Sequence, residues 1–150
     1  MDISKVGDPA FILLVDDNLH GLIARKTLLE ELGYRVSTAK DGEEALTLLR
    51  EASFDLVVTD FRMPGMDGGE LIRRVKAAEP ARPVILLSGF VEPLGLTEQA
   101  TGADVVIGKN AGEIRNLVRS VDRLLHRRIP RKPAASQRNG AVSRAKSKAR

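Results

Sequence analysis

Short apolar runs alternate along the first 126 residues with stretches in which apolar residues recur at helical spacing. Nearly continuous apolar runs are typical of parallel strands, because helices cover both faces of such a sheet. Four such runs and a fifth, less apolar one predict strands at residues 11–15, 34–38, 56–58, 84–87 and 105–107. This alternation predicts an α/β fold with a doubly wound, five-stranded parallel sheet and right-handed crossovers.

The segments between these runs carry apolar residues three or four positions apart, which is the spacing of one helix face. The periodic residues are Leu22, Leu29 and Leu32 in the first segment, Ala45, Leu48 and Leu49 in the second, Leu71, Ile72 and Val75 in the third, and Ile114, Leu117, Val118, Val121 and Leu125 in the last. Residues 91–101 include Pro93 and Gly95 and leave room for only a short helix.

Three helix starts share one signal, an Asp or Asn three residues before a Glu: Asp41 with Glu44, Asp67 with Glu70, and Asn110 with Glu113. The first side chain of such a pair can accept a hydrogen bond from a free amide of the first helical turn. Gly33 stands where a residue in the left-handed conformation would end the first helix. These signals predict where several helices begin and end.

Charge is divided unevenly along the chain, whose formal net charge is +4. Residues 127–150 contain nine Lys or Arg residues and no acid, which leaves 15 basic and 20 acidic side chains, a net charge of −5, in the first 126 residues. The final segment also has few large aliphatic residues, so it cannot bury enough surface to order itself. We therefore predict one folded domain at residues 1–128 and a basic, disordered tail at 129–150.

The composition excludes several classes of protein and site. No run approaches the ~20 apolar residues that span a bilayer, and the first ten residues, with two acids and a proline, make a poor signal peptide. The chain has no cysteine, which excludes disulfides, thiol nucleophiles and thiolate metal sites. We expect a cytoplasmic protein without a transmembrane segment.

Polar residues directly follow four of the predicted strands. In chain order they are Asp16 and Asp17 after the first strand, Asp60 at the end of the third, Ser88 after the fourth and Lys109 after the fifth. Because parallel strands end at one edge of the sheet, and ligands bind there, we expect these side chains to converge.

Three carboxylates at one edge repel one another and need a compensating cation. Oxygen ligands without a nearby His or Cys favour a hard ion, and partly hydrated Mg²⁺ fits best. Lys109 adds a positive charge and Ser88 a hydroxyl donor. A carboxylate with these neighbours can attack phosphorus and hold the oxygens of a phosphoryl group.

These residues resemble the receiver domains of response regulators in two-component signalling. The resemblance covers residues 11–126 and rests on Asp16-Asp17, on residues 60–68 (Asp-Phe-Arg-Met-Pro-Gly-Met-Asp-Gly), on Leu87-Ser88-Gly89 and on Lys109. It implies a stand-alone receiver with the flavodoxin-like (βα)5 fold, formed by residues 1–128.

The resemblance also implies a role for each site residue. Asp60 would be phosphorylated, and Ser88 and Lys109 would bind the phosphoryl group. Mg²⁺ would be held by Asp60, by Asp17 directly, by Asp16 through a water molecule and by the backbone carbonyl of Arg62. The phosphodonor would be a histidine kinase or a histidine phosphotransfer protein.

Two positions depart from the usual pattern of that family. Asn110 follows Lys109 where receivers usually have proline; a cis bond there would cost about 2.5–4 kcal/mol, and a trans bond could change the aim of Lys109. Val106 stands where a Tyr or Phe usually swings inward on activation. Val106 is too small and rigid for that movement, so a switch would need another readout, through Phe90 or the short fourth helix.

Three functional hypotheses remain. The first is a phosphorylation switch that is no enzyme beyond its own phosphorylation and dephosphorylation, and that signals through an unidentified output partner, a homodimer or the tail. The second is a receiver-like interaction module that does not switch. The third, an aspartyl phosphatase, is disfavoured, because haloacid-dehalogenase-type hydrolases need a second acid where Arg62 stands.

The basic tail has alternatives of its own. A charge run is by default a solvated segment, but it could bind nucleic acid or an anionic membrane surface, or fold back on the acidic domain. The tail has no aromatic residues for base stacking, so any binding to nucleic acid would be weak and sensitive to salt.

Overall fold

The computed structural model describes residues 8–89 and 94–128. Its five strands form one parallel sheet in the order β2-β1-β3-β4-β5, which confirms the predicted fold class. The strands are β1 (Phe11–Val15), β2 (Arg35–Ala39), β3 (Leu56–Asp60), β4 (Val84–Ser88) and β5 (Val105–Gly108). The predicted tail at 129–150 and Phe90 lie outside the described residues, so what was inferred about them stays a prediction.

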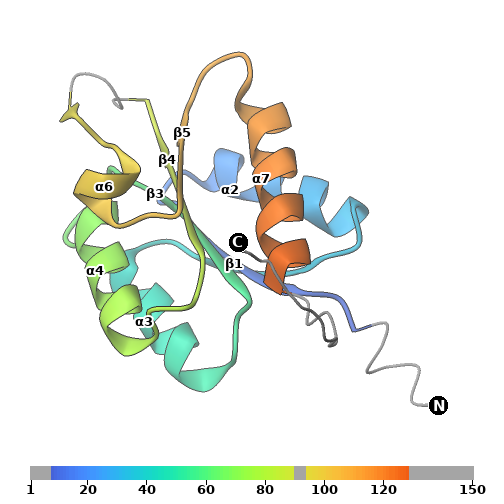
Figure 1. Ribbon diagram of the computed structural model, residues 1–150, viewed down its shortest axis with the longest axis horizontal. Helices are drawn as coiled ribbons and strands as arrows, with labels where there is room; N and C mark the ends of the chain where they lie inside the picture. The colour runs from blue at the N-terminus through green and yellow to red at the C-terminus, as the bar shows by residue number, and fades with distance from the viewer. Residues whose placement is uncertain (1–7, 90–93, 129–150) are drawn as a thin grey trace, which may run out of the picture.

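Helices cover both faces of the sheet (Figure 1). One face is covered by α3 (Gly42–Glu51), α4 (Gly68–Ala78) and α6 (Glu98–Thr101), and the other by α2 (Leu19–Glu31) and α7 (Glu113–Arg128). Within residues 8–89 and 94–128, no helix is both long and apolar enough to cross a bilayer.

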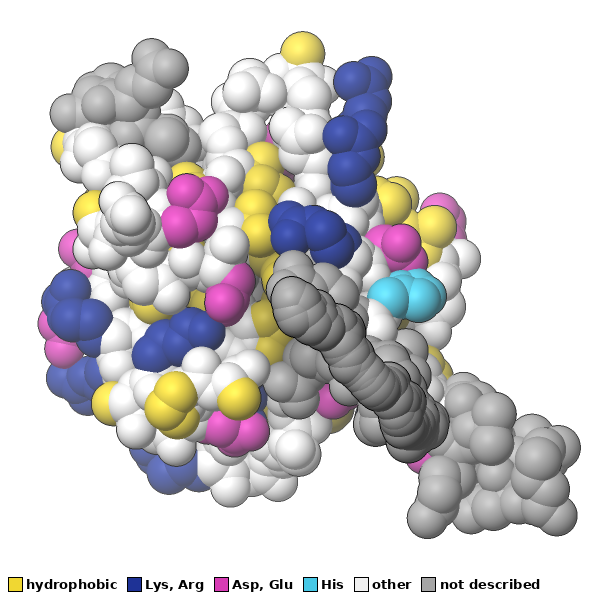
Figure 2. All heavy atoms as spheres, viewed as in Figure 1, with side chains coloured by type: hydrophobic (Ala, Val, Ile, Leu, Met, Phe, Trp, Pro, Cys, Tyr) yellow, Lys and Arg dark blue, Asp and Glu magenta, His cyan; other side chains and the backbone are white. Residues whose placement is uncertain are grey.

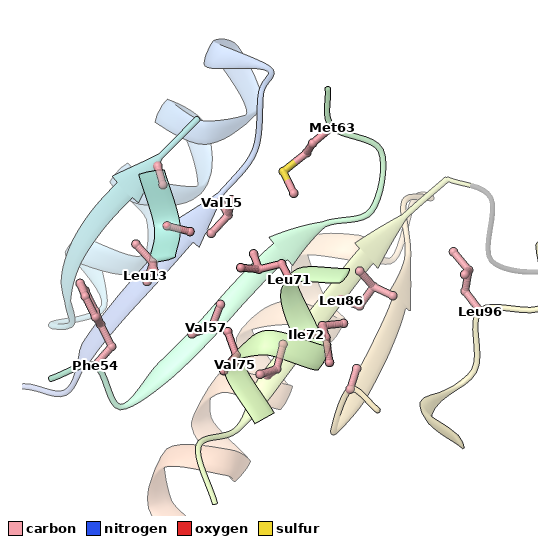
Figure 3. Close-up of a cluster of buried hydrophobic side chains, with 14 residues drawn as sticks. Leu13, Val15, Phe54, Val57, Met63, Leu71, Ile72, Val75, Leu86 and Leu96 are labelled. Carbon is pink, nitrogen blue, oxygen red and sulfur yellow. The ribbon is translucent and has the colours of Figure 1, made fainter. Parts of the chain in front are cut away.

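The core consists of two hydrophobic clusters, one on each side of the sheet. Successive residues of a strand point to opposite faces, so Leu13 packs into one cluster and its neighbour Ile12 into the other. Figure 3 shows the first cluster, in which Leu71 of α4 packs near Val57 and Leu86 of the central strands. Because both faces of the central strands are buried, β1, β3 and β4 are apolar over most of their length, which is the pattern seen in the sequence.

The outer surface differs from this interior. Figure 2 shows basic and acidic side chains interspersed over one face of the described residues, with hydrophobic side chains visible between them. Such a mixed surface is expected where amphipathic helices turn their apolar sides toward a sheet.

Two of the three predicted helix starts are confirmed. The side chain of Asp41 accepts a hydrogen bond from the amide of Glu44, and Asp67 accepts one from the amide of Glu70. Gly33, with a φ of 100°, adopts the predicted left-handed conformation after α2.

The predicted cap of the last helix was wrong. The side chain of Asn110 accepts from the amide of Gly112 at 2.9 Å, and α7 begins only at Glu113. Asn110 therefore forms a local turn before the helix, an alternative that short polar side chains offer the backbone. The sequence reading missed Asn18, which caps α2 by accepting from the amide of Gly21.

Two periodic residues are exposed rather than buried in the core. Leu32 and Ile114 are each 49% exposed. Leu32 lies just beyond the last residue of α2, and Ile114 lies in the first turn of α7 beside Glu113, whose side chain turns inward to Arg25. Arg25 itself occupies a buried position of α2, between Leu22 and Leu29 along the helix face.

Gly68 provides a test of how closely α4 packs on the sheet. A Cβ atom at this position would collide with the carbonyl oxygen of Asp60 and the Cα atom of Phe61, and neither backbone atom can move freely. We expect Gly68→Ala to lower the free energy of unfolding by about 1–3 kcal/mol, as overpacking does. Urea denaturation followed by circular dichroism measures the change.

Gly112→Ala is the matched control, because its Cβ would meet its nearest atoms at 3.5 Å, an ordinary contact. Its free energy of unfolding should stay within about 0.5 kcal/mol of the wild type. Equal stability of the two variants would show that α4 does not pack as closely as described.

Candidate functional site

Three carboxylates meet at the carboxyl edge of the sheet. Asp16 and Asp17 follow β1, and Asp60 is the last residue of β3, the strand paired with β1. One oxygen from each carboxylate lies within 4.8 Å of the other two. Asp16 and Asp60 are only 3% and 7% exposed, whereas Asp17 is exposed to solvent. The predicted convergence of these acids is therefore present in the structure.

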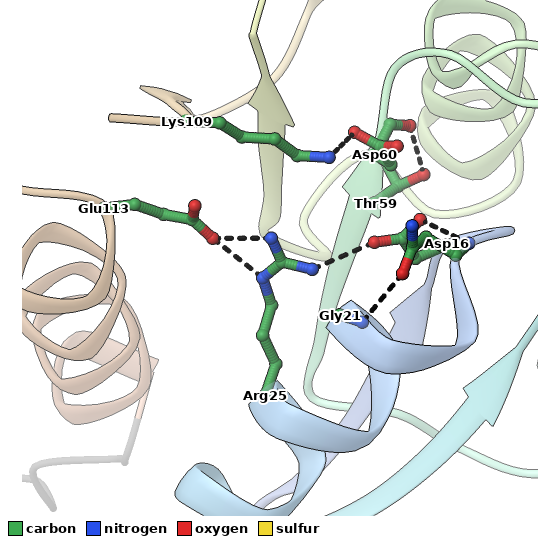
Figure 4. Close-up of polar contacts among 8 residues, drawn as sticks. Asp16, Gly21, Arg25, Thr59, Asp60, Lys109 and Glu113 are labelled. Atoms are coloured by element: carbon green, nitrogen blue, oxygen red, sulfur yellow. Dashed lines mark hydrogen bonds and ion pairs between the residues drawn. The ribbon is translucent and has the colours of Figure 1, made fainter. Parts of the chain in front are cut away.

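Lys109 extends from the end of β5 to Asp60 (Figure 4). Its Nζ atom lies 2.7 Å from Oδ1 of Asp60. The residues that the structure describes contain no cis peptide bond, so Lys109 makes this contact although Asn110 replaces the usual proline. The trans bond does not turn Lys109 away from the site.

The surroundings of Asp60 disfavour the ionised form of its carboxyl group. Burial raises the pKa of its carboxyl above the ordinary value, and the negative charge of Asp16 raises it further. The hydrogen bond and charge of Lys109, together with the backbone amide of Phe61, lower the pKa but do not cancel the effect of burial. Lys109 therefore compensates the charge of Asp60 only in part.

Asp16 has a cationic partner that the sequence reading missed. Its Oδ1 atom accepts from the amide of Asn18 at 2.9 Å, and its Oδ2 atom accepts from Nη1 of Arg25, also at 2.9 Å. Arg25 also donates through Nε and Nη2 to Glu113 in the first turn of α7. The signal that could have revealed Arg25 is its place three residues after Leu22 and four before Leu29, inside the apolar stripe of the first helix.

Ser88 lies at the same edge of the sheet. It is the last residue of β4 and is buried, and the register pairs it with Gly108, the residue before Lys109. The preceding residue, Leu87, pairs with Asp60 on the other side. The strand register thus brings Ser88 between the strands that carry Asp60 and Lys109.

An open depression of about 510 Å³ adjoins the acidic residues on the side of the β3–α4 loop. Asp17 lines it together with the loop residues Phe61, Arg62, Met63, Pro64, Gly65 and Asp67. Gly65, with a φ of 76°, lets the loop turn sharply between the strand and the helix. The depression leaves room for a small ligand beside the exposed carboxylate of Asp17.

Comparisons with known proteins agree with this geometry. The family model for the response regulator receiver domain matches residues 12–122. Among curated proteins, the virulence sensor protein BvgS of Bordetella pertussis is 41% identical over 109 residues, which are 67% of this chain and 9% of that protein. The gliding motility regulatory protein of Myxococcus xanthus is 36% identical over 119 residues, which are 75% of this chain and 15% of the relative. The chain thus spans less than a fifth of either relative.

Solved structures show the same architecture. The response regulator TrrA of Thermotoga maritima, in complex with Mg(2+)-BeF, has a TM-score of 0.70 and 31% identity, and the match covers 77% of this chain and 99% of that one. The chemotaxis protein CheY4 of Vibrio cholerae has a TM-score of 0.71 and 30% identity, with 78% and 99% covered. The family match, the parallel sheet and the acidic edge with its lysine lead to one conclusion: this chain belongs to the response regulator receiver domain family.

Proposed function

We propose that this chain accepts a phosphoryl group on Asp60 and signals through the phosphorylated state. The donor is a histidine kinase or a histidine phosphotransfer protein. The phosphorylated chain passes the signal on by binding a partner or by forming a homodimer. The observation that carries the proposal is the 2.7 Å contact between Lys109 and Asp60, beside two further carboxylates, in a chain of the receiver family.

In the proposed reaction, an oxygen atom of the Asp60 carboxylate forms a bond to phosphorus while the bond between phosphorus and the donor breaks. The ammonium group of Lys109 and the hydroxyl group of Ser88 then bind phosphoryl oxygens. Catalysis of this kind depends on positioning and on neutralising charge, so no other side chain has to move a proton to or from Asp60. Under this proposal the chain catalyses at most its own phosphorylation and dephosphorylation.

The donor set fits Mg²⁺. Three carboxylates supply hard oxygen ligands within 4.8 Å of one another, and the excess negative charge around Asp60 favours a divalent cation. Asp17 and Asp60, the backbone carbonyl of Arg62 and, through water, Asp16 would hold the ion. When bound, Mg²⁺ supplies positive charge beside the incoming phosphoryl oxygens. The Mg(2+)-BeF complex of the similar TrrA receiver supports this assignment.

A non-switching interaction module is the second candidate. Val106 motivates it, because this side chain packs partly buried against the core and has no aromatic ring to move. The amide of Val106 also donates to Glu98 of α6 at 2.9 Å, which ties β5 to that short helix. Under this alternative, partner affinity would not depend on Asp60.

The first prediction of this proposal is a stable phosphorylated form. Incubating the full chain with Mg²⁺ and acetyl phosphate should add one phosphoryl group, seen by intact mass spectrometry under acid conditions in which acyl phosphates persist. Asp60→Asn should stay unmodified, because its amide is a poor nucleophile.

Asp122→Asn is the matched control, since Asp122 is exposed on α7 and pairs with His126 rather than with the site. It should be modified as the wild type is, and a chelator should suppress the modification of both. An unmodified wild type, or a gain of mass that survives in Asp60→Asn, would contradict the assignment of Asp60.

The second prediction concerns stability without metal. Since burial raises the pKa of Asp60, the folded state binds a proton on this carboxyl more tightly than the unfolded state does. The resulting contribution to stability is present below the ordinary Asp pKa and is lost as the pH rises through the raised value. At pH 7, Asp60→Asn should therefore raise Tm by about 3–6 °C, an effect of roughly 1 kcal/mol for a domain of this size.

Thermal unfolding in the presence of a chelator, at pH 7 and at pH 4, measures this effect. The gain in Tm should shrink at pH 4, where more of the wild-type carboxyl is protonated. Asp122→Asn, in which the lost charge is exposed, should change Tm little at either pH. A lower Tm for Asp60→Asn at pH 7 would show that the pair with Lys109 outweighs the cost of burial.

A further inference from the structure

Arg25 connects the acidic edge to the last helix through two ion pairs (Figure 4). Its Nη1 atom lies 2.9 Å from Oδ2 of Asp16, and its Nη2 atom lies 2.6 Å from Oε2 of Glu113. A third contact joins Nε of Arg25 to the same Glu113 oxygen at 2.8 Å. One guanidinium group therefore bridges the end of β1 and the first turn of α7.

This bridge is enclosed rather than formed at the surface. The side chains of Arg25, Asp16 and Glu113 are only 10%, 4% and 15% exposed. A Cβ atom at Gly21, one helical turn before Arg25, would lie 3.0 Å from Nη1 of Arg25 and 3.3 Å from Oδ2 of Asp16. The missing side chain at Gly21 thus leaves the space that the ion pair fills. Enclosed charges interact more strongly than exposed ones, because water screens them less.

Arg25 and its partner Glu113 have opposite effects on how the acidic edge attracts a cation. The guanidinium group fixes the carboxylate of Asp16 and places a positive charge beside it, which opposes a divalent cation at the same edge. Glu113 lies on the other side of the guanidinium group and offsets part of its positive charge. Removing Arg25 should therefore strengthen the attraction for a cation, and removing the charge of Glu113 should weaken it.

We propose that Arg25 holds the carboxylate of Asp16 and, in balance with Glu113, limits how tightly this edge binds a divalent cation. The proposal deepens the function proposed above and rests on the Mg²⁺ site described there. It adds two residues, from α2 and α7, that would not contact the ion themselves. It also makes the first turn of α7 part of the electrostatic surroundings of the metal site.

The experiment is a calorimetric titration of the full chain with MgCl₂, for the wild type, Glu113→Gln and Arg25→Met. We expect Glu113→Gln to weaken Mg²⁺ binding about three- to tenfold and Arg25→Met to strengthen it by a similar factor, as the loss of one charge near a divalent ion should do. Opposite changes are the decisive result. An ion pair that merely stabilised the fold would lose the same contact in both variants, and both would shift affinity in the same direction or not at all.

Glu30→Gln is the matched control. Glu30 lies on α2, five residues beyond Arg25, and pairs with Lys26 at 2.9 Å on the exposed side of the helix. Its loss of one negative charge should change the Mg²⁺ affinity by less than about twofold, because exposed charges are screened. Circular dichroism and thermal unfolding check that each variant is folded. If Arg25→Met does not fold, the isosteric Glu113→Gln decides through a loss of Mg²⁺ affinity larger than that of Glu30→Gln at an unchanged Tm, because a merely structural ion pair would lower Tm as well.

The outcomes separate this proposal from the function on which it rests. A wild type that binds no Mg²⁺ overturns the metal site and the role of Arg25 together. A wild type that binds Mg²⁺ and is phosphorylated, with an affinity that Glu113→Gln leaves unchanged, overturns the role of Arg25 alone.

Discussion

The repulsion among three carboxylates at one edge of a parallel sheet is the constraint to which the surrounding structure responds. Each acid is accommodated differently: Asp60 by the ammonium group of Lys109, Asp16 by the guanidinium group of Arg25, and Asp17 by exposure to water. Lys109 follows β5 and Arg25 lies on α2, so the two cations reach the acids from different elements (Figure 4). Two cationic side chains thus neutralise part of the charge of the three carboxylates, and the remaining negative charge favours a cation.

The sheet and its covering helices could be predicted because the physics that forms them is local and repetitive. A strand such as Leu56–Asp60 begins with three apolar residues because helices cover both faces of the sheet, and α4 presents Leu71 and Val75 at helical spacing. The convergence of Asp16, Asp60 and Lys109 followed from the same rule, since all parallel strands end at one edge. The sequence therefore contained the fold and the acids of the site.

The bridge through Arg25 could not be predicted in this way. Nothing in the spacing of apolar residues says that an arginine at a buried helix position will pair with Asp16 on one side and with Glu113, 88 residues away, on the other. The predicted helix cap at Asn110 was wrong for another reason. The Asn110 side chain can form a local turn as readily as a helix cap, and sequence alone does not decide between them. The Arg25 bridge depends on where distant elements finally lie, whereas the Asn110 turn is a choice between two local conformations.

Two helices that begin near the acidic edge, α2 and α4, contain a glycine in their first turn. Glycine within a helix costs about 0.5–1 kcal/mol relative to alanine, so Gly21 and Gly68 weaken α2 and α4 locally. Gly21 leaves space for the contact between Arg25 and Asp16, and Gly68 lets α4 approach the backbone carbonyl of Asp60. At Gly21 and Gly68, where α2 and α4 pack close to Asp16 and Asp60, glycine therefore stands in place of a residue with a higher helix propensity. Residues with low helix propensity are expected where a helix borders a functional site. Here the two glycines allow α2 and α4 to pack close to Asp16 and to the backbone of Asp60.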